Sequence, residues 1–66
     1  MIIKSYNDLN QRTKDMIASN KKLTKGDLAW EIHKADHYNS IGMFWDFYKR
    51  QEILDTFNKM FGTNLK

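Results

Sequence analysis

The sequence predicts an all-α fold, a small three-helix bundle with helices at about residues 5–19, 25–37 and 40–61. Strand-forming residues are scarce, because the chain has no valine and few threonines. Apolar residues instead recur at the three- and four-residue spacing of amphipathic helices. The 66 residues contain no repeat, no low-complexity tract and no Gly/Ser linker, so we expect residues 1–66 to form a single helical domain.

The first predicted helix begins near Ser5, with Asp8 at the spacing of a capping box. Helical periodicity then places one apolar stripe on this segment. The stripe consists of Tyr6, Leu9, Thr13, Met16 and Ile17. We expect the helix to end near residue 19, before a basic connector.

The second predicted helix has the strongest start signal in the chain. Thr24 is a suitable N-cap and Asp27 completes a capping box, while Leu23 and Leu28 have the spacing of a hydrophobic staple. At about 100° per residue, two opposite faces of this helix are occupied. One face carries Leu28, Ile32 and Ala35, and the other carries Trp30, His33 and His37.

The third predicted helix is the longest, from a cap at Asn39 or Ser40 to Phe61, with Gly62 at the position that favours a left-handed C-terminal cap. Apolar residues lie on both sides of its first half, and residues 49–52 are all polar. Two shorter helices that meet near residues 49–51 are one interpretation. We favour a single helix, bent near residues 49–51, because no glycine or proline interrupts it there.

Composition narrows the classes of function. No apolar run exceeds three residues, so we expect a cytoplasmic protein with no membrane contact. There is no cysteine and no glycine-rich phosphate loop, and a bundle this small offers little room for a ligand pocket of roughly 300–1,000 Å³. His33 and His37 have the spacing of metal ligands but lack further ligands in the motif. We therefore expect no enzyme activity, no cofactor, no metal and no small-molecule substrate.

Large aromatic residues are concentrated between residues 30 and 48, and they suggest a protein-binding surface. We expect Phe44, Phe47 and Phe57 to fill the core. The predicted partner-binding residues are Trp30, His33, His37, Trp45 and Tyr48. Trp and Tyr are common interface anchors, so the leading hypothesis is a protein–protein interaction module, either an inhibitor or adaptor or a self-associating domain. The small size of the chain and its Asn- and Lys-rich composition are typical of proteins carried by phages and other mobile elements.

The alternative hypothesis is nucleic-acid binding. The net charge is +3, and basic residues cluster around the first connector. The segment from Leu23 to Ile32 resembles the first helix of a helix-turn-helix DNA-binding motif, although His33 stands where the turn usually has glycine. The predicted nucleic-acid contacts are Lys21, Lys22, Lys25, Tyr38, Asn39 and Ser40.

Overall fold

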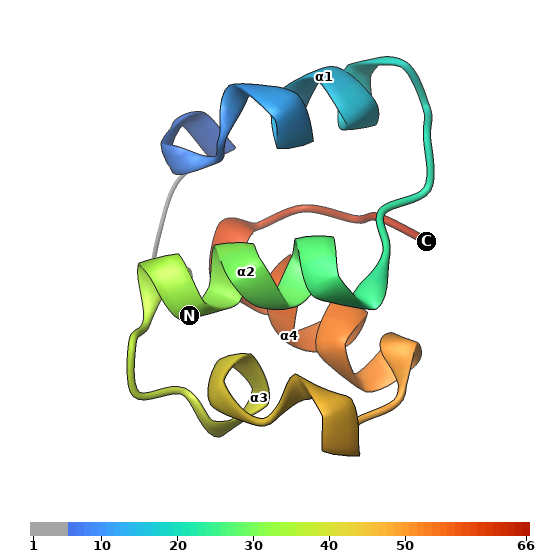
Figure 1. Cartoon of the computed structure of the whole chain (residues 1–66). Coiled ribbons are helices and arrows are strands. Elements are labelled where there is room, and N and C mark those ends of the chain that lie inside the picture. Colours follow the sequence, from blue (N-terminus) through green and yellow to red (C-terminus); the bar gives the residue numbers. More distant parts are fainter. Residues whose placement is uncertain (1–5) are drawn as a thin grey trace.

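The fold is all-helical, as predicted, over residues 6–66, which the computed structural model describes. Three helices of seven or more residues, α1, α2 and α4, form the small bundle. In chain order the elements are η1 (Tyr6–Asp8), α1 (Gln11–Ala18), α2 (Lys25–Ala35), α3 (Ser40–Met43), η2 (Trp45–Phe47) and α4 (Arg50–Phe61). Helix α2 is central, with α1 on one side and α3 on the other, and α4 packs against it from behind (Figure 1).

The first helix is shorter than predicted. Within the described residues it is divided into the 3₁₀ turn η1 and helix α1, which begins after Asn10. The predicted cap Ser5 lies outside the described residues. The backbone of Asn10 is extended, and its N–H donates a 3.1 Å hydrogen bond to the carboxylate of Glu31 on α2. The start of α1 therefore coincides with a contact to another helix. The sequence around residue 10 alone does not reveal that contact.

The start of α2 is confirmed. The hydroxyl of Thr24 accepts a hydrogen bond from the backbone N–H of Asp27, and the Asp27 carboxylate accepts one from the backbone N–H of Thr24, both at 3.1 Å. Leu23 and Leu28 are both buried. The helix ends at Ala35, earlier than predicted, so His37 lies beyond it.

The expectation of one long helix over residues 40–61 is wrong. The chain forms α3, then η2, and then α4, which at 12 residues is the longest helix described. A straight helix over that range would be about 33 Å long at roughly 1.5 Å per residue. The described chain extends only 28 Å along its longest axis. The interruption at Tyr48 and Lys49, which have extended backbones, allows α3 and α4 to pack separately against α2.

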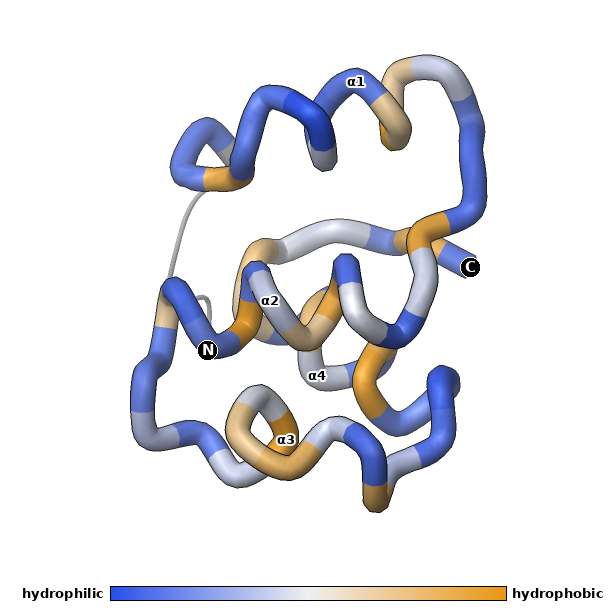
Figure 2. Tube along the Cα trace, in the orientation of Figure 1, coloured by the Kyte–Doolittle hydropathy of each residue, from blue (hydrophilic) through white to orange (hydrophobic). Residues whose placement is uncertain are grey.

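The core lies mainly between α2 and α4. Its buried side chains are Leu9, Leu23, Leu28, Ala29, Ile32, Ile53, Leu54, Phe57, Met60 and Phe61. Gly62 has a left-handed backbone (φ 67°, ψ 30°) and ends α4 as predicted. Figure 2 shows α1 as mostly hydrophilic and α3 as mostly hydrophobic. Within residues 6–66, no helix has the length and apolar character needed to cross a membrane.

Two of the predicted core aromatics lie on the surface. Phe57 is fully buried, as expected, but Phe44 is 52% exposed and Phe47 is 84% exposed. The assignment of Phe44 and Phe47 to the core assumed a continuous helix. Because the helix is interrupted, these rings fall on a short segment whose other side, at Ile41 and Tyr48, packs against the core.

Candidate functional site

A small hollow lies between α2 and the segment that contains α3 and η2. It encloses about 230 Å³ and is lined by Gly26, Ala29, Trp30, His33, Gly42 and Trp45. We call it the aromatic hollow. Trp30 is 54% exposed and Trp45 is 38% exposed, so both indoles are accessible at its edge. The structure thus brings together three of the five predicted partner-binding residues, Trp30, His33 and Trp45.

Of the two glycines that line the aromatic hollow, Gly42 determines how closely this segment approaches α2. A Cβ atom on Gly42 would lie 3.0 Å from the backbone nitrogen of His33 and 3.1 Å from its Cα, which is too close for an unshifted side chain. Gly26 lies beneath the indole of Trp45, where an added Cβ would be 4.0 Å from the ring and in ordinary contact. Gly42 therefore permits the contact between α3 and α2 that positions Trp45 beside Trp30.

The two histidines connect the aromatic hollow to Tyr38. The ring centroids of His33 and His37 are 4.5 Å apart, and those of His37 and Tyr38 are 5.2 Å apart in an edge-to-face arrangement. Nδ1 of His33 is buried without a hydrogen-bond partner. Across residues 6–66 no group of three His, Cys, Asp or Glu side chains could hold a metal ion.

Tyr48, the remaining predicted partner-binding residue, packs towards the core and is less exposed than its neighbours. It is partly buried against the core, and its hydroxyl lies 3.4 Å from the hydroxyl of Ser40. Other residues on the same segment are exposed where Tyr48 is not. Among residues 7–66, whose exposure the structure describes, the large exposed hydrophobic side chains are Trp30, Tyr38, Met43, Phe44, Trp45 and Phe47, and we call them together the aromatic surface. Sequence reasoning missed Met43, Phe44 and Phe47, and the polar residues 49–52 were the only signal of the interruption that exposes them.

The predicted nucleic-acid contacts are divided between the two ends of α2. Lys21 and Lys22 are exposed in the connector before α2, whereas Tyr38 and Asn39 lie in the loop after it and Ser40 is the first residue of α3 (Figure 1). The side chain of Asn39 accepts a hydrogen bond from the backbone N–H of Ile41 and so caps α3. Lys25 points towards the aromatic surface, with its ammonium 5.8 Å from the centroid of Trp45.

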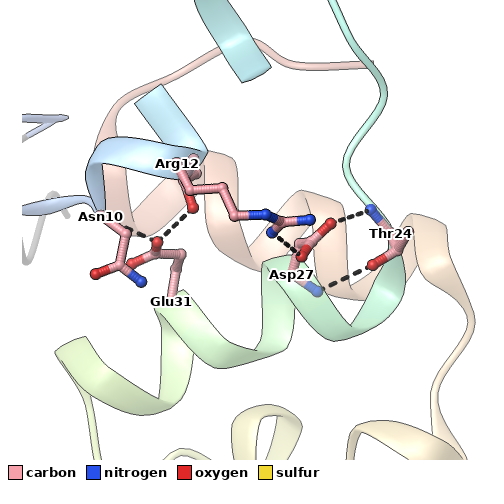
Figure 3. A network of polar contacts seen from close by, with 6 residues as sticks. Asn10, Arg12, Thr24, Asp27 and Glu31 are labelled. Carbon is pink, nitrogen blue, oxygen red and sulfur yellow. Dashed lines mark hydrogen bonds and ion pairs between the residues drawn. The ribbon is translucent and has the colours of Figure 1, made fainter. Parts of the chain in front are cut away.

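A polar network that the sequence did not reveal attaches α1 to α2 (Figure 3). Glu31 is only 1% exposed. One oxygen, Oε2, accepts hydrogen bonds from the hydroxyl of Thr13 at 2.6 Å and from the backbone N–H of Asn10 at 3.1 Å. The other oxygen, Oε1, forms an ion pair at 3.2 Å with the ammonium of Lys34. Burial of this carboxylate is thus compensated by groups from both helices.

A second polar contact lies one turn away on α2. Nη1 of Arg12 is 2.7 Å from Oδ1 of Asp27. The hydrogen bond from Arg12, opposed by desolvation and aided by the hydrogen bonds from Thr24, lowers the pKa of the Asp27 carboxyl below its ordinary value. Asp27 therefore caps α2 and holds α1 at the same time, which makes its role structural.

The geometry of residues 6–66 thus offers two features that a partner could recognise, the aromatic surface and the exposed basic connector. Comparisons with models of protein families, with curated proteins and with solved structures give no match to this chain. The function must therefore be argued from the residues themselves.

Proposed function

We propose that this protein is a protein–protein interaction module that binds its partner through the aromatic surface. The observation that supports this most directly is the aromatic hollow, whose lining combines two accessible Trp side chains with the small residues Gly26, Ala29 and Gly42. A recess lined by such small residues leaves space for a side chain from a partner. Trp side chains beside such a recess have the features of interface anchors.

The degree of exposure also supports a partner. Tyr38 and Phe47 are each 84% exposed. A chain this small needs most of its large apolar side chains in the core, so their exposure calls for another role. Extended apolar patches on monomers commonly mark interaction sites. The histidine pair and Lys25 lie at the edge of the aromatic surface, where a polar rim is expected.

The test combines light scattering with affinity capture. Size-exclusion chromatography with light scattering shows whether the partner is a second copy of the chain. Capture from a lysate of the source cells then compares the wild type with a Trp30→Gln/Phe47→Ser variant. Lys59→Gln on the exposed side of α4 is the control.

We expect the double variant to lose self-association or the captured protein, and the control to retain it. Circular dichroism must show that both variants stay folded, which their exposed positions favour. If the double variant associates and captures as the wild type does, the aromatic surface is not the binding site and the proposal fails.

Nucleic-acid binding is the second candidate, and the exposure of Lys21 and Lys22 in one connector favours it. Contacts to phosphates make binding weaken as salt increases. A Lys21→Glu/Lys22→Glu variant should then bind a random-sequence duplex pool less tightly than the wild type at about 50 mM salt. Absence of wild-type binding to that pool would exclude this candidate.

A further inference from the structure

A second and larger hollow lies on the side of the molecule where the α1–α2 connector meets the C-terminal segment. It encloses about 430 Å³, within the range of roughly 300–1,000 Å³ that small-ligand sites occupy. A bundle this small was expected to offer little room for a hollow of this size. Four aliphatic side chains contribute to its lining. Ile17 from α1 and Leu65 from the C-terminal segment are partly exposed there, whereas Leu23 and Leu54 belong to the buried core beneath it.

Cationic side chains surround this aliphatic lining. Lys21, Lys22, Arg50 and Lys66 all line the same hollow, and none of the described residues that line it is acidic. We call this hollow the basic groove. Its chemistry differs from that of the aromatic hollow, because it combines several positive charges with aliphatic rather than aromatic groups.

The walls of the basic groove are held by specific contacts. Arg50 donates from Nε to the backbone carbonyl of Leu23 at 3.0 Å and from Nη2 to that of Lys66 at 3.4 Å. Asn58 on α4 exchanges hydrogen bonds with the backbone of Leu65, donating to its carbonyl at 3.1 Å and accepting from its N–H at 3.0 Å. The guanidinium and the C-terminal segment are therefore already in position without a ligand.

The connector is shaped by one unusual residue. Asn20 has a positive φ of 59°, and the N–H of Lys21 donates to the carbonyl of Met16 at 2.8 Å. Asparagine tolerates this left-handed backbone better than most residues. The turn ends α1 and directs Lys21 and Lys22 along the edge of the basic groove.

We propose that the basic groove binds an aliphatic carboxylate, with the alkyl chain against the partly exposed Ile17 and Leu65 and the carboxylate among the lysines and Arg50. Charge complementarity selects an anion, and the lining selects an alkyl body. Single-stranded nucleic acid fits less well, because no aromatic residue lines the groove for bases to stack on. This site is separate from the aromatic surface, so it stands or falls independently of the proposed function.

The experiment is a titration of the ¹⁵N-labelled protein with octanoate, followed by the amide signals in two-dimensional NMR spectra. Octanol is the control with the same chain and no charge, and acetate is the control with the charge and no chain. A thymidine oligonucleotide tests the nucleic-acid alternative. The variants are Lys21→Gln/Lys22→Gln, which removes two exposed charges from the groove, and Lys59→Gln, which removes one elsewhere.

We expect octanoate to shift the amide signals of residues 20–23, 54 and 65, and to bind more tightly than octanol or acetate. The Lys21→Gln/Lys22→Gln variant should weaken octanoate binding by about three- to tenfold, while Lys59→Gln leaves it unchanged. Equal binding of octanol or of acetate, shifts at Trp30 and Trp45 instead of the groove, or tighter binding of the oligonucleotide at the groove would each overturn the proposal.

Discussion

Replacement of Thr13 by valine tests the polar attachment of α1 to α2. Thr13 is 3% exposed, and its hydroxyl donates a 2.6 Å hydrogen bond to the buried Glu31 carboxylate. Valine keeps the shape of the side chain but cannot donate. A hydrogen bond to a charged group contributes about 1.5–3 kcal/mol, so we expect the free energy of unfolding to fall by about 2 kcal/mol. That is a large share of the roughly 3–5 kcal/mol expected for a domain of this size.

The measurement is urea unfolding followed by circular dichroism, with Thr13→Ser as the matched control. Serine keeps the donor and removes one methyl group, which costs about 1 kcal/mol. We also expect Tm to fall by about 10 °C in Thr13→Val, given about 4–8 °C per kcal/mol for small domains. If the valine variant is no less stable than the serine variant, the hydrogen bond to Glu31 does not stabilise the fold and the reasoning is refuted.

Three further predictions concern α2 and its neighbours. Gly42→Ala should lower the free energy of unfolding by about 1–3 kcal/mol because of overpacking against α2; Gly26→Ala, where the Cβ fits, should cost nothing in the same thermal melts. Because the pKa of Asp27 is lowered, its ionised carboxylate stabilises the fold at pH values above the ordinary pKa of 3.8. This stabilisation is lost as the pH falls through the lowered pKa. In unfolding curves measured at successive pH values, Asp27→Asn should therefore reduce the loss of unfolding free energy that the wild type shows at acid pH. An unchanged loss would assign the acid sensitivity to other groups. Each single-Trp variant reports on one indole: Trp45→Phe leaves Trp30, which is 54% exposed, and Trp30→Phe leaves Trp45, which is 38% exposed. Acrylamide should therefore quench the fluorescence of Trp45→Phe more strongly than that of Trp30→Phe, and the reverse order would contradict the described geometry.

Local sequence signals predicted the parts of the fold that depend on neighbouring residues along the chain. The capping box of Thr24 and Asp27 and the left-handed cap at Gly62 are both present at the expected positions. Each needs only a few adjacent side chains and the geometry of one helix end. The lack of valine and the low number of threonines likewise predicted the all-α class.

The errors arose where distant residues decide the structure. The start of α1 depends on Glu31, which lies in another helix. The interruption after α3 accompanies the separate packing of α3 and α4 against α2, including the close contact of Gly42 with His33, and this packing is not visible in local periodicity. The exposure of Phe44 and Phe47 followed from that interruption, so one missed break changed the interpretation of two aromatic residues.

The interruption also separates the residues that fold the protein from those that a partner would meet. Phe57 and its neighbours on α4 fill the core, whereas Phe47 is 84% exposed and contributes little buried area. Substitutions at such exposed positions usually change stability by less than about 0.5 kcal/mol. Mutations could therefore alter the aromatic surface while Gly42 and α4 preserve the scaffold. Under the proposed function, a lineage carrying this fold could change its partner without losing the ability to fold.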